Sequence, residues 1–416
     1  MQNHFDALET RPPGQREREL FAELPGVLAN AMQHAPAMAR HLQDIDPATV
    51  RGRDALARLP VLRKHELQER QQAERAVAGD PMGGFATAGW GRLHRVFASP
   101  GPIYEPESAR ADYWRFGRAL YAAGFRPGEL VHNCFAYHFT PAGSMMETAA
   151  HAVGCTVFPG GTGQTEQQVR AMQDLRPSGY TGTPSFLKLI LEKADDMGVT
   201  LPFLKKALVS GEAFPPSLCK WLGDRGVEGY QAYGSADLGM IAYETAAREG
   251  LVLGEDIILE IVRPGTGDPV PDGEVGEVVV TTFNPDYPLI RFGTGDLSAI
   301  LPGQSPCGRT NQRIRGWLGR ADQTTKVRGM FVHPTQVADI VRRHPEIGRA
   351  RLVVEDSPSG DLMLLHIEVD GQPEGLAASV ADTARELTKL RAEVRLAAPG
   401  SLANDGKVIE DARKYE

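Results

Sequence analysis

The fold is decided by residues 179–210, which read GYTGTPSFLKLILEKADDMGVTLPFLKKALVS. This stretch predicts a strand over 179–183, a helix over 184–197 and a second strand over 206–210. The predicted helix carries one apolar stripe, which is typical of packing against a core and is formed by Phe186, Leu187, Ile190 and Leu191. A strand–helix–strand order of this kind predicts parallel strands joined by a crossover helix.

The alternation continues on the N-terminal side of this stretch. Residues 108–125, 142–153 and 165–175 read as helices, whereas 130–137 and 155–158 are compact apolar runs of strand type. The first ninety residues are rich in Arg, Glu, Ala and Gln and predict short helices interrupted by prolines at 12, 13, 25, 36, 47, 60 and 81. The fold class is therefore α/β, with a large N-terminal domain built on mostly parallel sheets.

The character of the chain changes beyond residue 227. Strands are predicted over 257–262 and 275–282, and the turn-rich residues between them indicate a β-rich subdomain. After Gly319 the sequence predicts a small α+β unit, with a helix at 334–343, a hairpin formed by 350–355 and 362–369, and a helix at 376–393. We therefore expect a large domain over 1–321 and a small one over 322–416.

Composition excludes several classes of protein. The 416 residues include 45 Lys and Arg and 53 Asp and Glu, so the formal charge of −8 does not supply the positive field of a nucleic-acid binder. The polar N-terminus does not resemble a signal peptide, and no apolar run reaches membrane-spanning length. The expected location is the cytoplasm, without membrane association. Cysteines at 134, 155, 219 and 307 form no metal-binding spacing and are expected to be reduced and mostly buried.

Four short segments occur in a specific order along the chain: Tyr233-Gly-Ser-Ala-Asp237, Arg291-Phe-Gly-Thr-Gly-Asp296, Gly319-Arg-Ala-Asp-Gln323 and Asn404-Asp-Gly-Lys407. In this order and at these separations they resemble the adenylate-forming (acyl-CoA synthetase) superfamily, most closely its phenylacetate–CoA ligase branch. The resemblance extends from about residue 93 to the C-terminus. It implies a large AMP-binding domain and a mobile C-terminal lid.

The resemblance assigns roles to the charged residues of these segments. Asp296 ends a Gly-Thr-Gly turn, and its two carboxylate oxygens are suited to accept hydrogen bonds from both ribose hydroxyls. Arg320 is implied as a second ribose or phosphate contact. Lys407 is implied as the catalytic cation that bridges the acid carboxylate and the α-phosphate of ATP.

Two further segments are implied in nucleotide binding. Their residues are Ser210, Gly211 and Glu212, and then Tyr233, Gly234, Ser235, Ala236 and Asp237. The Tyr233 ring is expected near adenine. The family has Thr or Ser followed by Glu where this chain has Ala236 and Asp237, and Asp237 is expected to hold Mg²⁺ through a shorter side chain.

The acid and thiol sites are also implied by the resemblance. Tyr137, His138, Phe139 and Phe214 are expected to line the acyl pocket, and aromatic residues suit an aromatic acid. For His138 the sequence leaves two alternatives open: orientation of a substrate polar group, or a hydrogen-bonded place in the pocket wall. The tunnel for coenzyme A is expected to contain Arg328, Gly329, Met330 and Phe331, and Asp322 matches the hinge of the lid.

The phosphate loop departs from the family pattern. The family reads approximately Ser-Ser-Gly-Thr-Thr-Gly-Lys-Pro, whereas this chain has Ser99-Pro-Gly101-Pro-Ile-Tyr-Glu105-Pro106. A carboxylate replaces the lysine, and prolines at 100 and 102 remove two N–H donors. Three alternatives follow: Glu105 points away from the phosphates, another cation compensates, or the first half-reaction is slow or lost.

The predicted function is that of an AMP-forming acid–CoA ligase acting on an aromatic or short acyl acid, with ATP/AMP, Mg²⁺ and coenzyme A as cofactors. One alternative is a degenerate homologue that binds nucleotide or acyl-CoA without full turnover of ATP. Another is an adenylating enzyme that loads a carrier protein. The oligomeric state stays open, with a homodimer among the alternatives.

Overall fold

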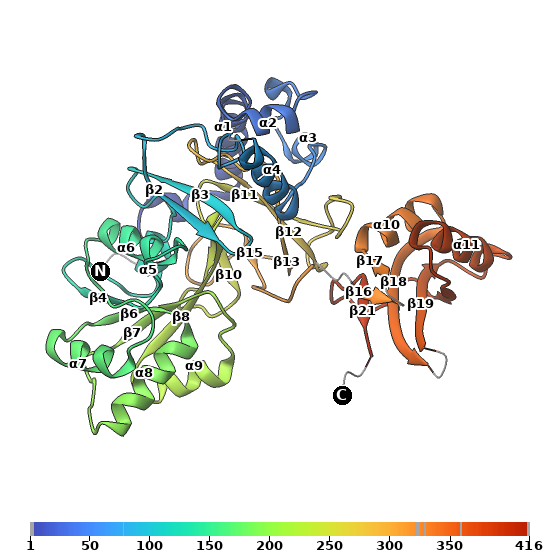
Figure 1. Ribbon diagram of the computed structural model, residues 1–416. Coiled ribbons are helices and arrows are strands. Elements are labelled where there is room, and N and C mark those ends of the chain that lie inside the picture. Colours follow the sequence, from blue (N-terminus) through green and yellow to red (C-terminus); the bar gives the residue numbers. More distant parts are fainter. Residues whose placement is uncertain (1–3, 78, 322–324, 328–329, 358–359, 414–416) are drawn as a thin grey trace. The chain divides into compact units, whose positions relative to one another are not determined.

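A computed structural model (Figure 1) describes residues 4–77, 79–321, 325–327, 330–357 and 360–413. The chain divides into two compact units. The first contains residues 1–259, 280–292 and 301–317, and the second contains 260–279, 293–300 and 318–416. None of the helices in the described ranges is long and apolar enough to cross a membrane.

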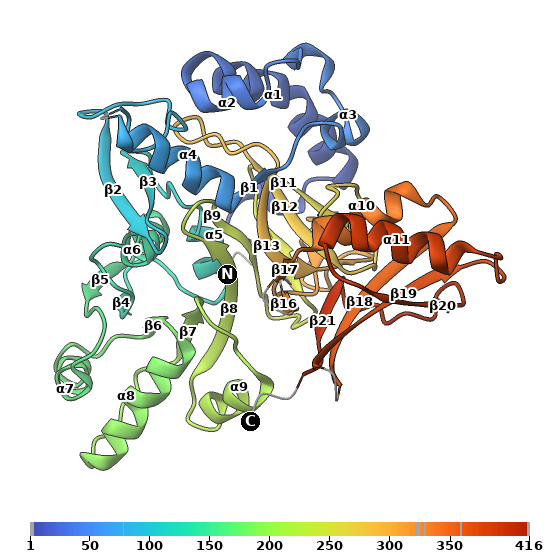
Figure 2. The ribbon, with the colours of Figure 1, turned by 45° about the vertical axis from the view of Figure 1, so that its right-hand side comes forward.

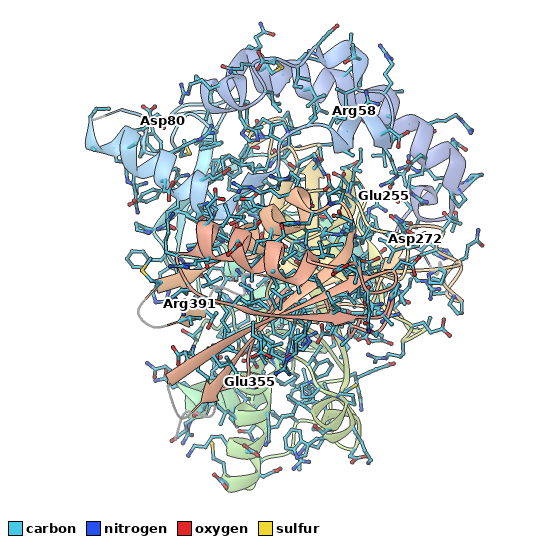
Figure 3. All side chains as sticks on the ribbon, turned by 90° about the vertical axis from the view of Figure 1, so that its right-hand side faces the viewer. Arg58, Asp80, Glu255, Asp272, Glu355 and Arg391 are labelled. Atoms are coloured by element: carbon cyan, nitrogen blue, oxygen red, sulfur yellow. The ribbon has the colours of Figure 1, made fainter. Side chains whose placement is uncertain are left out.

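The N-terminal part of the first unit is helical. Its helices are η1 (Ala7–Thr10), α1 (Pro13–His34), α2 (Pro36–His41), η2 (Pro47–Thr49), α3 (Arg53–Ala57) and α4 (Lys64–Ala76). The expected interruption at Pro25 is wrong, because α1 continues through this residue for 22 residues in all. Phe21, Leu24 and Leu28 are buried on one face of α1, and this packing continues on both sides of the proline. Figure 3 labels Arg58 and Asp80, which lie in this N-terminal part, after α3 and after α4.

A nine-stranded sheet forms the centre of the first unit. Its strand order is β14-β15-β10-β9-β8-β7-β6-β4-β5. The strands are β4 (Leu130–Asn133), β5 (Thr156–Pro159), β6 (Gly179–Gly182), β7 (Lys206–Val209), β8 (Glu228–Ser235), β9 (Gly239–Tyr243), β10 (Leu251–Leu253), β14 (Ile300–Leu301) and β15 (Arg313–Ile314). The neighbouring strands β5, β4, β6, β7 and β8 pair in parallel. The pairs β8–β9, β9–β10 and β10–β15 are antiparallel.

Crossover helices connect the parallel strands, as the alternation of the sequence predicts (Figure 1). They are α6 (Ala142–Val153), α7 (Thr165–Leu175), α8 (Pro184–Asp196) and α9 (Pro216–Gly223). Thr183 caps α8, since its hydroxyl accepts from the Phe186 amide, and Pro184 occupies the first helical position. Leu187, Ile190 and Leu191 of α8 are buried, so the predicted stripe is a core contact.

The helix predicted over 108–125 is mostly absent. Only α5 (Gly117–Ala122) is helical, and the preceding segment turns through Asp112 and Arg115, which have φ values of 46° and 65°. The Asp112 carboxylate accepts from the Gly117 amide, and the Arg115 guanidinium donates to the carbonyls of Leu238 and Met240. These side-chain bonds to the backbone stabilise a turn in place of the first helical turns.

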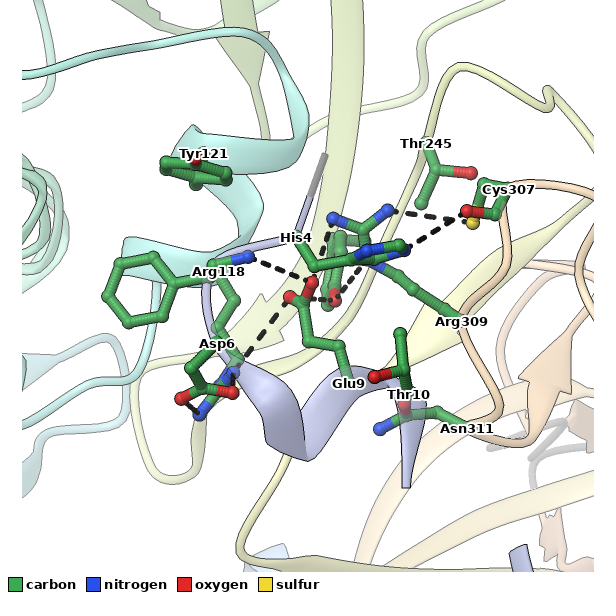
Figure 4. Close-up of polar contacts among 12 residues, drawn as sticks. His4, Asp6, Glu9, Thr10, Arg118, Tyr121, Thr245, Cys307, Arg309 and Asn311 are labelled. Atoms are coloured by element: carbon green, nitrogen blue, oxygen red, sulfur yellow. Dashed lines mark hydrogen bonds and ion pairs between the residues drawn. The ribbon is translucent and has the colours of Figure 1, made fainter. Parts of the chain in front are cut away.

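The N-terminal segment is held by a buried carboxylate, Glu9 (Figure 4). Its oxygens accept from the Tyr243 hydroxyl at 3.0 Å and the Phe5 amide at 3.1 Å, and lie 3.0 Å from Nη2 of Arg309. Asp6 is bound through two oxygens by Arg118 at 2.8 and 2.7 Å. Partners more than 100 residues away in the sequence therefore anchor this segment.

The second unit contains a four-stranded sheet in the order β20-β19-β18-β21. Its elements are β16 (Thr325–Val327), β17 (Met330–Val332), α10 (Pro334–Arg343), β18 (Ile347–Ser357), β19 (Gly360–Val369), α11 (Leu376–Thr388), β20 (Glu393–Ala397) and β21 (Ile409–Asp411). Figure 2 shows α10 and α11 on one face of this sheet. The helix predicted to reach 393 ends at Thr388, because Lys389 adopts a left-handed φ of 64°.

The remaining strands form two smaller sheets. One has the order β1-β13-β12-β11 and contains β1 (Leu62–Arg63), β11 (Ile257–Val262), β12 (Gly276–Thr282) and β13 (Phe292–Ser298). The other is a hairpin of β2 (Leu93–Ser99) and β3 (Ile103–Ser108). The strand-rich region predicted between 227 and 302 is thus present, and the hairpin contains the altered phosphate loop.

Candidate functional site

Several predicted site segments lie near the carboxyl ends of strands of the nine-stranded sheet. Residues 137–139 follow β4, residues 210–212 follow β7, and Tyr233 lies near the end of β8. Parallel strands place their carboxyl ends at one edge of the sheet, and ligands in open α/β sheets bind at this edge. The first unit therefore places these segments towards the carboxyl ends of its parallel strands.

The segment after β4 presents aromatic side chains. The Tyr137 hydroxyl accepts from Nδ2 of Asn133 at 2.7 Å, and the Phe139 side chain is exposed. Phe139 has a left-handed φ of 62°, and its carbonyl accepts from the Ala98 amide of β2 at 2.7 Å. This conformation is costly for a bulky residue, and it is the observation that most favours a functional role for the segment. His138 is exposed beside Phe139.

Residues after β7 have local structural partners. The Ser210 hydroxyl donates to the Ala232 carbonyl at 2.8 Å, and the Glu212 carboxylate accepts from the Ser185 amide at 2.6 Å, in the first turn of α8. Phe214 is only 8% exposed and belongs to the core cluster of β6, β7 and α8. Gly211 is exposed between these residues.

The segment at the end of β8 is irregular. Tyr233 pairs with Ala242 and Gly234 pairs with Met240, so one extra residue of β9 lies between the two pairs. Such bulges are frequent next to binding sites because they turn a side chain to a new direction. Tyr233 is half-buried, and the Ser235 hydroxyl accepts from the Leu238 amide at 3.2 Å. Ala236 is half-buried before the buried Asp237.

The phosphate loop is a tight hairpin turn. Ser99 of β2 pairs with Ile103 of β3, which leaves only Pro100, Gly101 and Pro102 in the turn. Gly101 has a φ of 149°, a conformation that glycine adopts more readily than other residues. The two prolines carry no amide hydrogen. The turn therefore has one backbone donor where the family loop has three.

Glu105 is completely buried and does not face solvent. Its carboxylate accepts from both the hydroxyl and the amide of Ser99. Burial, together with the nearby negative charge of Asp237, raises the pKa of Glu105 to about 8, although the Ser99 bonds and Lys64 act in the opposite direction. The Glu105 carboxylate is therefore buried and engaged by Ser99 within the protein.

The structure also supplies a cation at this place. Nζ of Lys64, the first residue of α4, lies 2.8 Å from Oδ2 of Asp237. The Lys64 side chain is 37% exposed, whereas that of Asp237 is 1% exposed. Lys64 also acts electrostatically on Glu105. A lysine from the N-terminal helices thus lies beside the carboxylate that is expected to hold the metal.

Asp237 fits the Mg²⁺ that the family resemblance implies. Its other oxygen, Oδ1, is buried and has no hydrogen-bond partner within the part of the chain that the structure describes. The described residues contain no group of three or more His, Cys, Asp or Glu that could hold a metal ion. Mg²⁺ is commonly held by one or two carboxylates together with phosphate oxygens and water, so a single carboxylate oxygen suffices on the protein side.

Sequence reasoning missed the helix that supports the hairpin. Lys64, Gln68 and Gln71 lie at positions i, i+4 and i+7 of α4 and therefore share one helix face. Gln68 donates to the Gly101 carbonyl, and the buried Gln71 amide both donates to and accepts from the backbone of Tyr104 at 2.9 Å. The spacing of these polar residues indicates only that they share one face of a helix, and it does not reveal which residues that face contacts.

In the second unit, Asp296 and Arg320 form an ion pair of 2.8 Å. The backbone segments of the two residues pair as an isolated bridge next to β13, and the Asp296 amide donates to the Thr294 hydroxyl. Asp296 is mostly buried, whereas the Arg320 side chain is 54% exposed. The structure therefore brings these two predicted nucleotide contacts together.

Lys407 lies elsewhere in the second unit. It lines a cavity together with Arg263, Val337 and Arg349, and neither Asp296 nor Arg320 belongs to the lining. Its backbone amide donates to the Asp405 carboxylate at 3.1 Å. The predicted hinge Asp322 and the tunnel residues Arg328 and Gly329 lie outside the described residues. Met330 begins β17 and is half exposed, and Phe331 follows it in the same strand.

Comparisons with known proteins show the family of the chain. Residues 110–284 match the family model of the AMP-binding enzymes. The chain is 32% identical to the phenylacetate-coenzyme A ligase of Thermus thermophilus over 380 residues, which cover 87% of this chain and 83% of the relative. It is 26% identical to the phenylacetate-coenzyme A ligase of Escherichia coli, with 94% and 90% covered.

A solved structure has a similar fold over almost the whole chain. It is 2-hydroxyisobutyryl-CoA ligase in an open conformation, in complex with 2-HIB-AMP and CoA. It superimposes with a TM-score of 0.73 at 25% identity and covers 97% of this chain and 92% of its own. The altered turn at residues 99–103 and the shorter carboxylate at Asp237 are therefore departures within a shared fold. The chain belongs to the phenylacetate–coenzyme A ligase family of AMP-binding, adenylate-forming enzymes.

Proposed function

We propose that this protein is an AMP-forming acid–CoA ligase that activates a carboxylic acid with ATP and transfers the acyl group to coenzyme A. The observation that carries the proposal is the buried Asp237, which holds Lys64 through one oxygen and has a second oxygen without a partner among the described residues. A carboxylate in this state suits a Mg²⁺ ion that also binds the phosphates of ATP.

In the first half-reaction a carboxylate oxygen of the acid attacks the α-phosphorus, an acyl-adenylate forms, and pyrophosphate leaves. Negative charge builds on the phosphoryl oxygens and must be neutralised by cations. Lys64 takes the place of the missing loop lysine, Arg320 binds ribose or phosphate, and Lys407 bridges the acid and the α-phosphate. Bound Mg²⁺ supplies further neutralisation at Asp237.

In the second half-reaction the thiol sulfur of coenzyme A attacks the acyl carbonyl. A thioester forms, the thiol proton is released, and AMP leaves with the electrons of the broken acyl–phosphate bond. Asp296 holds the ribose of the adenylate during this step, since its carboxylate accepts from both hydroxyls. Met330 and Phe331 lie along the path of the thiol arm.

The acid is an aromatic or short acyl acid. Tyr137 and the strained, exposed Phe139 supply an aromatic wall at the edge of the sheet where ligands of this fold bind. The Tyr137 ring is held by its hydroxyl bond to Asn133, so its orientation is set before the acid arrives. A preorganised wall lowers the entropy cost of binding.

One observation favours a second candidate, a homologue that binds nucleotide without full turnover. The amide and hydroxyl of Ser99 both donate to Glu105, so they are engaged within the protein and not offered to phosphate. If Lys64 does not compensate, AMP binds better than ATP and turnover is lost. A carrier protein as acyl acceptor is the third alternative.

The test is incubation with ATP, MgCl₂ and a panel of aromatic and short aliphatic acids, in parallel with coenzyme A and with a phosphopantetheinylated carrier protein. AMP and the acyl thioester are quantified by mass spectrometry. Equal amounts of AMP and acyl-CoA support the ligase. Binding of AMP in calorimetry without product favours the binder, and acylation of the carrier protein alone favours the third alternative. Asp237→Ala serves as the inactive control.

A further inference from the structure

The second unit contains a cavity of about 190 Å³ with an apolar interior and a cationic lining. The interior is contributed by Val270, Val275, Val337, Ala338, Val341, Ala350 and Val408. The positively charged lining residues are Arg263, Arg342, Arg349 and Lys407. The negatively charged ones are Asp268 and Glu274, so the lining has an excess of two positive charges. An engineered apolar cavity of about 150 Å³ binds benzene, so this volume accommodates one aromatic ring.

Arg349 reaches the cavity because β18 is bulged there. Ile347 pairs with Val369 and Ala350 with Ile367, so three residue steps on β18 oppose two on β19. The extra residue releases Gly348 and Arg349 from the regular ladder, and both line the cavity. Bulges of this kind re-aim side chains at functional sites. Nη1 of Arg263 lies 3.5 Å from the Gly348 carbonyl and joins the opposite wall to the bulge.

The turn that carries Lys407 is fixed at the mouth of this cavity. Asp405 pairs with Arg351 at 2.8 Å, and the Asn404 side chain accepts from the Val275 amide. Gly406 is required at this place, because a Cβ there would lie 2.5 Å from a methyl carbon of Val275. No hydrogen bond or ion pair of the Lys407 ammonium is found within the described ranges. The turn therefore presents a cation whose own charge is not neutralised by a bonded partner.

We propose that this cavity is a second binding site for a carboxylate with an apolar body about the size of one aromatic ring. The valines of α10 and of the 270–275 segment take up the apolar body, and Arg349 and Lys407 bind the carboxylate. An uncharged apolar ligand would supply no counter-charge to Arg349 and Lys407, and a polyphosphate would leave the apolar interior unfilled. An apolar carboxylate satisfies both parts of the lining.

A consequence rests on the proposed function of Lys407. An acid bound in this cavity holds the Lys407 ammonium there, where it cannot serve the adenylation step. Excess acid then inhibits the first half-reaction and leaves the second one unaffected. The site thus makes the enzyme sensitive to the concentration of an acid of the same class as its substrate.

The test uses 4-fluorophenylacetate and ¹⁹F NMR on the full-length protein, with the catalytic acyl site saturated by phenylacetyl-sulfamoyl adenosine. We expect a second binding event that remains after saturation. Arg349→Ala weakens it about tenfold, as expected for the loss of a hydrogen bond between charged groups. Val341→Trp fills the cavity and abolishes it. The control is Arg343→Ala, because Arg343 is a cation of α10 that pairs with Glu386 and lies outside the lining.

Two outcomes overturn the proposal: no binding after saturation, or equal affinities in Arg349→Ala and Arg343→Ala. Failure of the sulfamoyl compound to bind contradicts the proposed function instead. In that case the affinities of Arg349→Ala and Arg343→Ala for 4-fluorophenylacetate, measured without the sulfamoyl compound, still show whether the cavity binds the acid. Circular dichroism of each variant separates loss of the site from loss of the fold.

Discussion

Nζ of Lys64 lies 2.8 Å from Oδ2 of Asp237, and these residues are separated by 173 positions in the chain. The pair places a cation of the N-terminal helices beside the buried carboxylate that is expected to hold Mg²⁺. Asp237 is almost fully buried, whereas Lys64 keeps part of its side chain in solvent. Under the proposed function, Lys64 exchanges Asp237 for a phosphate oxygen of ATP when a metal ion binds to Asp237.

Lys64→Ala should lower the first half-reaction about tenfold to hundredfold, which corresponds to the loss of a charge-assisted interaction of about 1.5–3 kcal/mol. ATP–pyrophosphate exchange measures this step. Thioester formation from a supplied acyl-adenylate should change little, because pyrophosphate is no longer present. His65→Ala is the control, since His65 is exposed on the same helix. Equal exchange rates in both variants would contradict the role of Lys64.

Glu105→Gln should change how stability depends on pH. The pKa of Glu105 is raised to about 8 in the folded protein, so the folded state holds a proton that the unfolded state releases near pH 4.5. The free energy of unfolding should therefore fall as pH rises through this window, by up to about 1.4 kcal/mol per pH unit. The groups that act on Glu105 are Asp237, Lys64 and Ser99.

Urea unfolding of wild type and Glu105→Gln at pH 5.5 and pH 8 measures this effect. The glutamine variant keeps the hydrogen-bonding shape but cannot ionise, so its loss of stability over this interval should be smaller. Identical losses in the two proteins would show that Glu105 does not titrate in this range.

Lys407→Ala should block adenylation and leave thiol attack on a supplied acyl-adenylate mostly intact, because the lysine serves only one half-reaction. Pyrophosphate release and acyl-CoA formation are followed separately. Arg395→Ala is the matched control, since Arg395 is an exposed cation of the same unit that pairs with Glu393. Equal losses in both half-reactions, with the fold intact, would argue against a lysine that serves one step.

Asp296→Ala should lower AMP affinity at least tenfold, because two charge-assisted hydrogen bonds to ribose are lost, each worth about 1.5–3 kcal/mol before water compensates. The fold should survive, since the pair with the largely exposed Arg320 contributes only about 0–1 kcal/mol. Calorimetry with AMP measures the change. Unchanged affinity would remove Asp296 from the site.

Glu9→Ala should destabilise the first unit by about 3–5 kcal/mol, because it leaves the buried Arg309 without its carboxylate. Urea unfolding measures the loss. Glu19→Ala is the control: Glu19 also pairs with an arginine, but its side chain is 46% exposed, so a much smaller change is expected. Similar effects of the two substitutions would contradict the anchoring role of Glu9.

The sequence by itself determined the elements whose cause is local. The stripe of α8, the bounds of α6, α7 and α10, and the parallel order of the sheet follow from apolar periodicity, caps and strand–helix alternation. The family motifs also predict Asp237, Asp296, Arg320 and Lys407 as charged groups of the site. Local signals failed before α5, where Asp112 accepts from the nearby Gly117 amide and Arg115 donates to the distant Leu238 carbonyl, and these bonds override helix formation.

Only the tertiary structure decided which partners these charged side chains contact. Residue type places a carboxylate at 105, but packing decides that it is buried beside the donors of Ser99, and this burial raises the pKa of Glu105. Lys64 carries no sequence signal of its role, because its partner is 173 positions away. Contacts of this kind depend on how packed elements bring distant residues together, and a linear pattern does not contain that information.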